Sequence, residues 1–101
     1  MDGRPWLHGE RRRRLPGKKW PLWWEWELEL SPHLLKRMLD RRFTEVDLRT
    51  MLDVASAFRR DVAPERWVID TRHARRSWEV IVEPDAEAQL LVVITAYPVE
   101  D

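Results

Sequence analysis

The stretch ELSPHLLKRMLDRRF, residues 29–43, marks the point at which the chain changes from alternating to helical spacing. Serine is a favoured N-cap and proline is favoured at the first helical position, so Ser31 and Pro32 predict a helix start. His33 and Arg37 are four residues apart, and we expect their side chains to share one face of this helix. The apolar residues beside them predict the buried stripe, which comprises Leu34, Leu35, Met38 and Leu39.

A second helix is predicted directly after this stretch. Thr44 is a suitable N-cap, and Asp47 stands three residues later in the position of a capping-box acid. Phe43 can pack on Leu48 across the helix start as a hydrophobic staple. The buried face predicted for this helix comprises Leu48, Met51, Leu52 and Ala55.

The segment WWEWELEL, residues 23–30, precedes the first helix and alternates strictly between apolar and acidic residues. This period predicts a half-buried strand. Its glutamates are spaced in a way that could suggest a metal site. We interpret them instead as a solvated outer face that keeps an edge strand from pairing with other chains.

From about residue 57 the spacing changes to a period of two. RWVIDTR (66–72) and SWEVIVE (77–83) alternate, and AFRRD (57–61) is a further short strand candidate. LLVVITAY (90–97) is apolar on both faces, which predicts a central strand covered on both sides. The inward-facing set comprises Trp67, Ile69, Thr71, Trp78, Val80 and Val82. The order predicts an α+β fold, in which an N-terminal strand and two helices pack on one side of a three- to four-stranded antiparallel sheet.

The chain has 101 residues, which suffices for one domain with a modest core. It contains no cysteine, which excludes disulfides and thiolate chemistry. No apolar run approaches the roughly 18 to 20 residues that span a bilayer, and no signal-peptide core is present. We therefore expect a cytoplasmic protein without a membrane partner, with a mobile basic arm over residues 1–20 and one domain over residues 21–101.

The net charge of zero hides an uneven distribution. Residues 1–20 hold seven Lys or Arg against two acids (+5), whereas residues 77–101 hold six acids and no base (−6). The run of Arg11, Arg12, Arg13 and Arg14 is typical of a solvated charge segment, and it could alternatively bind phosphates without sequence preference.

Several site classes are missing from the sequence. No glycine-rich phosphate loop, zinc-protease motif or nucleophile elbow occurs, so we expect no cofactor and no metal. What remains is one histidine among arginines, a set that can cleave RNA without metal, because a base can take the 2′-hydroxyl proton while guanidinium groups stabilise the phosphate. We predict His33 as the base and Arg37 and Arg72 as phosphate stabilisers, with Arg41, Arg42 and Arg66 as RNA contacts.

Each of these residues also has a structural interpretation. Arg37 could pair with Asp40. Thr95 and Tyr97 share parity with the inward Leu91 and Val93, which favours core packing. Arg72 has the opposite parity to Trp67 and Ile69, so a regular strand would point it away from the helices.

Two segments, PHLLKRMLDRRFTEVDL (32–48) and WEVIVEPDAEAQLLVVITAYP (78–98), resemble a widespread group of small bacterial domains. That group is similar to the BrnT-like and RelE-like toxins, within the barnase, EndoU, colicin and RelE class of ribonuclease folds. The resemblance covers roughly residues 26–99 and depends on His33, three further residues, then Arg37 and Met38. The five tryptophans before residue 27 and the arginine arm lie outside the pattern.

The resemblance implies metal-independent RNA cleavage within a toxin–antitoxin pair. It places His33 and Arg37 on the first helix, and Thr95 and Tyr97 at the polar end of the last strand. The expectation is therefore a toxin-type ribonuclease with RNA and an antitoxin protein as partners and no small-molecule cofactor. The alternative is a non-catalytic module that binds RNA or protein on the same scaffold.

Overall fold

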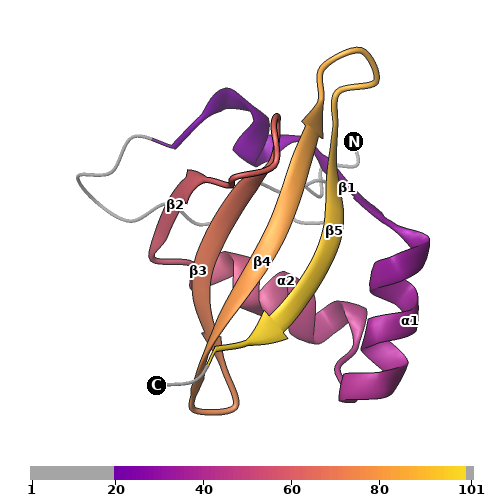
Figure 1. Ribbon diagram of the computed structural model, residues 1–101, viewed down its shortest axis with the longest axis vertical. Helices are drawn as coiled ribbons and strands as arrows, with labels where there is room; N and C mark the ends of the chain where they lie inside the picture. The colour runs from indigo at the N-terminus through magenta and orange to yellow at the C-terminus, as the bar shows by residue number, and fades with distance from the viewer. Residues whose placement is uncertain (1–19, 100–101) are drawn as a thin grey trace, which may run out of the picture.

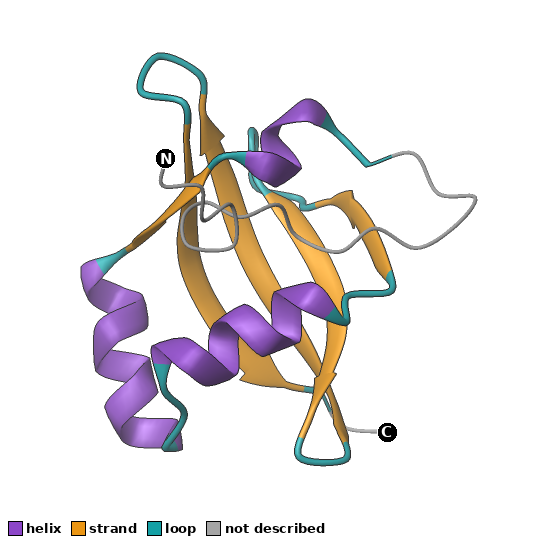
Figure 2. Ribbon diagram, turned by 180° about the vertical axis from the view of Figure 1, so that it is seen from behind, coloured by secondary structure: helices purple, strands orange, loops and turns teal. Residues whose placement is uncertain are grey.

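The computed structural model describes residues 20–99 and has two layers, a twisted sheet and a pair of helices (Figure 1). Helix α2 crosses one face of the sheet, and α1 stands beside the β5 side of the sheet; the view from behind shows the same arrangement (Figure 2). Within residues 20–99 no helix covers the opposite face, which we call the open face. The predicted α+β class is confirmed.

The order along the described chain is a 3₁₀ helix, a strand, two helices and four strands. These are η2 (Leu22–Glu25), β1 (Glu27–Leu30), α1 (Pro32–Arg41), α2 (Glu45–Asp53), β2 (Ala57–Arg60), β3 (Trp67–His73), β4 (Arg76–Asp85) and β5 (Leu90–Pro98).

The sheet differs from the predicted three or four antiparallel strands. It has five strands in the order β1-β5-β4-β3-β2, and β1 pairs with β5 in parallel. A parallel pair needs a long crossover, which here comprises both helices and the remaining strands. Residue periodicity carries no information on strand direction, so the sequence could not distinguish this mixed sheet from an antiparallel one.

The N-terminal strand is shorter than the predicted 23–30. Its first half forms η2, closed by Trp24 N–H donating to the Pro21 carbonyl at 3.0 Å. Trp24 is fully buried and stacks on Trp20 at 4.5 Å between ring centroids. Trp20 is thus part of the described core, and residues 1–19 of the predicted arm lie outside the described residues.

Helix α1 begins as predicted, because the Ser31 hydroxyl accepts from Leu34 N–H at 3.0 Å and Pro32 occupies the first position. Half of its predicted stripe is wrong. Leu34 is buried and Met38 partly so, whereas Leu35 is 50% and Leu39 82% exposed. A helix beside a sheet touches the core along a narrow strip, so the outer half of the stripe remains in solvent.

Helix α2 follows the prediction closely. Thr44 and Asp47 form a reciprocal capping box, and the backbone hydrogen bond from Thr44 lowers the pKa of the Asp47 carboxyl. Its predicted core face is confirmed, since Leu48, Met51, Leu52 and Ala55 are all buried. The staple residue Phe43 is buried in the same cluster.

The helix-facing sides of β3 and β4 also match the prediction. Ile69, Trp78, Val80 and Val82 are buried, and the buried Thr71 hydroxyl donates to the Met51 carbonyl. Trp67 is only half-buried, at the margin of an aromatic cluster with Trp23 and Phe58.

Strand β5 contains a β-bulge that its sequence does not reveal. Ile81 pairs with Thr95 but Val82 pairs with Val93, so Ile94 is an extra residue. The alternation therefore resets, and Ala96 faces the helices with Leu91 and Val93. The strand was predicted to be central and covered on both sides; it is an interior strand between the edge strand β1 and the central strand β4, and its second face is half-exposed.

Candidate functional site at the seam between α1 and β5

The region where α1 runs beside the last half of β5 is fixed at both of its ends. Strand β1 pairs with β5 only as far as Val93, and the chain then turns into α1. At that point the Ser31 hydroxyl donates to the Ile94 carbonyl at 2.8 Å, the carbonyl of the bulge residue. At the other end, Arg41 Nη1 donates to the Ala96 carbonyl at 3.0 Å. Strand β1 therefore borders the first half of β5, and helix α1 borders the second half.

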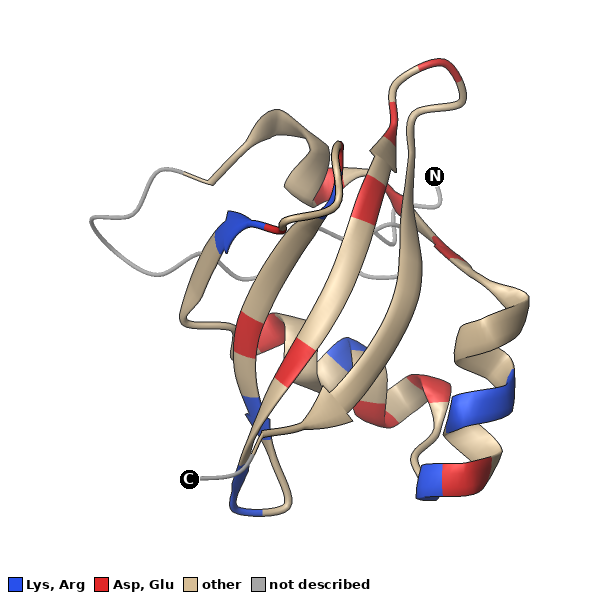
Figure 3. Ribbon diagram, viewed as in Figure 1, with Lys and Arg blue, Asp and Glu red and all other residues tan. Residues whose placement is uncertain are grey.

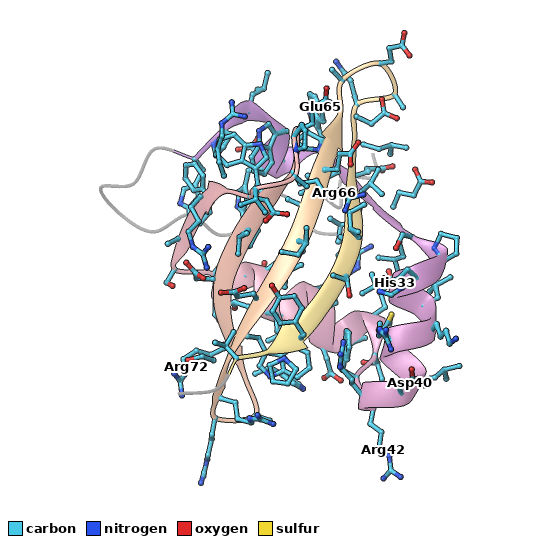
Figure 4. All side chains as sticks on the ribbon, in the orientation of Figure 1. His33, Asp40, Arg42, Glu65, Arg66 and Arg72 are labelled. Atoms are coloured by element: carbon cyan, nitrogen blue, oxygen red, sulfur yellow. The ribbon has the colours of Figure 1, made fainter. Side chains whose placement is uncertain are left out.

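His33 and Arg37 lie between these two anchors on α1. The Arg37 Nε–H donates to His33 Nε2 at 3.4 Å, and Arg37 Nη1 contacts Asp40 Oδ2 at 3.3 Å. His33 is exposed, and the Arg37 side chain is 36% exposed. In Figure 4, His33 extends from the side of α1 nearest β5. The predicted sharing of one helix face is confirmed, and the Arg37–Asp40 pair also forms.

Thr95 and Tyr97 lie in the last half of β5. The parity argument that turned them toward Leu91 and Val93 is wrong, because the bulge at Ile94 reverses the parity after it. Both are only partly buried, and Tyr97 pairs with Glu79 of β4. They therefore belong to the open face of the sheet rather than to the core.

Tyr97 is held by a carboxylate. Its hydroxyl donates to Glu79 Oε1 at 2.7 Å. Burial, with the hydrogen bond and the negative charge of Glu79, raises the pKa of Tyr97 to about 12. The phenol is thus protonated over the whole neutral range.

The Glu79 carboxylate is the centre of a polar network that sequence reasoning missed. Arg59 Nη2 lies 3.1 Å from Asp70 Oδ1 and 2.6 Å from Glu79 Oε2, and the hydrogen bond to Asp70, followed by that to Glu79, raises the pKa of the guanidinium. The network joins β2, β3, β4 and β5 across the open face. Asp70 and Glu79 alternate with buried residues in the sequence, but their partnership depends on strand register, which no local pattern supplies.

The other predicted RNA-contact residues are spread over the molecule. Arg72 points to the open face, as its parity indicated, and contacts Ser77 at 3.4 Å near the β3–β4 hairpin. Arg66 pairs with Glu83 at 3.1 Å. In Figure 4, Arg66 lies toward one end of the sheet, Arg72 toward the other, and Arg42 points away from the base of α1. His33 is therefore brought together with Arg37 but not with Arg72. Arg11, Arg12, Arg13 and Arg14 lie outside the described residues.

Charged residues of both signs are spread over the described part of the chain. Acidic residues lie on β1 and the β4–β5 hairpin but also on β3, β4 and both helices, and Lys and Arg lie on both helices, on β2 and at the β3–β4 hairpin (Figure 3). Within residues 20–99 no group of three or more His, Asp or Glu is placed to hold a metal ion. None of the helices in that range is both long and apolar enough to pass through a bilayer.

Comparisons add no relative from which a function could be carried over: no protein-family model matches the chain, and neither curated proteins nor solved structures give a significant match.

Proposed function

We propose that the domain is a metal-independent endoribonuclease of toxin type that acts at the α1–β5 seam. The observation that carries the proposal is the His33–Arg37 pair, an imidazole nitrogen accepting from a guanidinium on a helix anchored to β5. A base beside a guanidinium is the minimum set for attack of a 2′-hydroxyl on the adjacent phosphate. Toxin type includes an antitoxin protein as the partner that inhibits cleavage.

The proposed reaction begins at the Nε2 lone pair of His33. The Arg37 contact to this nitrogen is long, at 3.4 Å, so a phosphate can draw the guanidinium away and free the base. His33 then takes the 2′-hydroxyl proton while the 2′-oxygen attacks phosphorus. Arg37 suits the phosphate because its planar fork donates to two oxygens at once.

Departure of the 5′-oxygen completes the step. The bond from phosphorus to the 5′-oxygen breaks, and that oxygen takes the proton of the Tyr97 hydroxyl, which a pKa of about 12 keeps protonated until then. The products are a 2′,3′-cyclic phosphate and a 5′-hydroxyl. Tyr97 then takes a proton from water, and His33 releases to water the proton that it took from the 2′-hydroxyl, so the protein is unchanged. Arg72, near the β3–β4 hairpin, would contact a neighbouring phosphate of the same strand.

A second candidate is a non-catalytic module that binds RNA or protein. The observation in its favour is that the cations of α1 are partly used within the fold, since Arg37 pairs with Asp40 and Arg41 binds a backbone carbonyl.

The test is cleavage of total RNA by purified protein in EDTA, with the products examined for cyclic phosphate ends. His33→Gln should abolish cleavage, and Arg37→Gln should reduce it by about 10²-fold or more, as for loss of one transition-state donor. Lys36→Gln is the matched control, because it removes one positive charge from the same exposed helix turn and leaves the His33–Arg37 pair intact. A gel shift without cleavage would support the binding module. The absence of both cleavage and a gel shift would overturn the ribonuclease and the RNA-binding module.

A further inference from the structure

The described arginines fall into two groups, which differ in what their guanidinium groups contact. The first group is held within the fold by a carboxylate, a backbone carbonyl or an aromatic ring; it comprises Arg37, Arg41, Arg49, Arg59, Arg60 and Arg66. The second group is exposed and has no carboxylate partner among residues 20–99; it comprises Arg42, Arg72, Arg75 and Arg76. We call this second group the basic end.

The basic end lies at one end of the molecule. The β3–β4 hairpin projects there beyond the end of β5 (Figure 1), and Figure 4 shows Arg72 near this hairpin and Arg42 at the base of α1, toward the same end of the view. A buried contact joins the two parts, because Phe43, which follows Arg42, packs edge-on against Trp78 at 5.3 Å between ring centroids. The hairpin and the base of α1 are therefore fixed relative to one another through the core.

Carboxylates on the adjoining helical turns do not neutralise the basic end, since each already has a partner. Asp40 pairs with Arg37 on α1, and Glu45 pairs with Arg49 on α2. Asp47 accepts a hydrogen bond from the Thr44 backbone N–H in the capping box. Guanidinium groups without such partners leave a positive local potential, which attracts anions.

The composition of the hairpin favours a phosphate backbone over a protein or a membrane as the partner. Trp78 is buried, and no large apolar side chain is exposed between residues 72 and 78. The core of a protein interface and a membrane-bound surface both need exposed apolar groups, whereas a polynucleotide backbone is bound mainly through charge. Arginine suits phosphates because its planar fork can donate to two oxygens.

We propose that the basic end binds the phosphate backbone of RNA without reading its bases, as a surface separate from the His33–Arg37 pair. The choice of RNA rests on the proposed ribonuclease function, but the binding itself requires no cleavage. A long RNA that occupies the α1–β5 seam extends past the end of β5 onto Arg72 and the hairpin. The basic end therefore raises the affinity for long RNA and has no contact with a dinucleotide.

Arg42 and Arg75 allow charge to be removed from the basic end without weakening the fold. Their φ values of 56° and 67° lie in the region that glycine adopts without strain. Arg42→Gly/Arg75→Gly should leave the urea midpoint of unfolding unchanged or higher, while the affinity for a 2′-O-methyl oligouridylate falls several-fold. This probe lacks the 2′-hydroxyl, so binding is measured without cleavage. The slope of log affinity against log salt should flatten by about 1.4, at about 0.7 for each phosphate contact on a single strand.

Two control variants separate the backbone and charge effects. Gln89→Gly changes a residue with φ of 56° in the β4–β5 hairpin at the other end of the sheet, and it should leave the affinity unchanged. Arg49→Gln removes a positive charge that is already paired with Glu45, and it should change the salt slope little. Residues 1–19 are the same in every variant, so differences in slope report the substituted side chains. An unchanged slope in the double variant, or a change in Arg49→Gln as large as in Arg75→Gly alone, would overturn the proposal.

Cleavage measurements distinguish a failure of this surface from a failure of the ribonuclease. Arg42→Gly/Arg75→Gly should raise KM for long RNA several-fold and leave kcat/KM for a uridine dinucleotide unchanged. Binding that depends on the basic end without any cleavage would overturn the ribonuclease and retain the basic end. An unchanged KM for long RNA would overturn the basic end and retain the ribonuclease. Polyglutamate that binds as tightly as the oligouridylate, with the same loss in the double variant, would overturn the proposal in favour of an acidic protein partner.

Discussion

The two faces of the sheet are built from the same strands but are stabilised by different forces. On the helix side, alternate residues such as Ile69, Val80 and Val82 are completely buried under α2. On the open side, Val68 and Ile81 are also buried, but beside them lies a charged network in which Arg59 joins Asp70 and Glu79, and Glu79 holds Tyr97. The helix side therefore depends on apolar area removed from water, whereas the open side adds to two buried apolar residues a set of directional pairs that remain partly in contact with water.

This difference separates stability from chemistry. Burial of apolar side chains is non-directional and excludes water. The covered face can therefore stabilise the fold, but it offers no group that a substrate could reach. The open face and the α1–β5 seam expose the groups that can titrate, donate or bind, including His33, Arg37 and Tyr97. Substitutions on the two faces should consequently differ in size and in their dependence on pH.

The largest effect is expected from the covered face, at Trp78. Its ring is 6% exposed and packs edge-on against Phe43 and His73. Trp78→Ala should lower the free energy of unfolding by about 3 to 5 kcal/mol, measured by urea denaturation. Ser77→Ala, one residue earlier and on the open face, is the control and should change it by no more than about 0.5 kcal/mol. A loss below about 1 kcal/mol at Trp78 would mean that the register of β4 is wrong.

Local signals predicted the covered face well. The caps at Ser31 and Thr44 act over three residues, and alternation along β3 and β4 repeats every second residue, so both can be recognised in a short window. The exposure of Leu39 could not be recognised, because it depends on α1 lying beside the sheet rather than over it. The same holds for the parallel direction of β1, which depends on the path of the whole chain.

Residues on both sides of the candidate site were named from the sequence, but only the arrangement of the helical half was predicted. His33 and Arg37 share a face because their spacing fixes it within one helix. The orientation of Tyr97 follows from one extra residue, Ile94, whose bulge is set by pairing with β4 and by the bond from Ser31. The Glu79–Arg59 partnership likewise needs the register of three strands. Contacts that join distant segments were therefore the ones that sequence patterns did not show.

The seam between the faces should show an intermediate effect at Ser31. Its hydroxyl caps α1 and also donates to the Ile94 carbonyl, so Ser31→Ala removes two interactions at once. The expected loss is about 1 to 2 kcal/mol in free energy of unfolding by urea denaturation. Ser31→Thr keeps the hydroxyl and should retain most of the stability. Equal losses in the two variants would show that the hydroxyl is not the anchor.

The open face should respond to pH where the covered face does not. Because folding raises the pKa of Tyr97 from its ordinary 10 to about 12, the folded state favours the protonated phenol. The resulting stabilisation is complete below pH 10 and is lost as the pH rises from 10 to 12. Since the group is partly exposed, we expect at most about 1 kcal/mol.

Tyr97 is the only tyrosine in the chain, so phenolate absorbance reports it directly. Glu79→Gln removes the negative charge beside the phenol and should bring its pKa back toward 10. Glu83→Gln, which changes a carboxylate that no hydrogen bond links to Tyr97, should leave the titration in place. A midpoint near 10 in the unaltered protein would contradict the bond between Tyr97 and Glu79.

The smallest effect is expected where β3 turns into β4 and neither face is involved. Ala74 and Arg75 form the two-residue turn, with φ of 53° and 67°. A residue with a Cβ in this left-handed region costs roughly 1 to 2 kcal/mol, and glycine relieves that cost while adding about 0.5 to 1 kcal/mol of backbone entropy. Ala74→Gly should therefore raise the free energy of unfolding by about 0.5 kcal/mol in urea denaturation.

The matched control for this turn is Ala88→Gly in the β4–β5 hairpin, where φ is not positive. At Ala88 glycine relieves no backbone strain. It only raises the backbone entropy of the unfolded chain, so the free energy of unfolding should fall slightly. Because Ala74→Gly leaves Asp70, Glu79 and the buried valines unchanged, the Tyr97 titration should not move. A change in the pKa of Tyr97 would show that the turn affects the position of Glu79. The register of β3 and β4 would then depend on the hairpin turn as well as on burial.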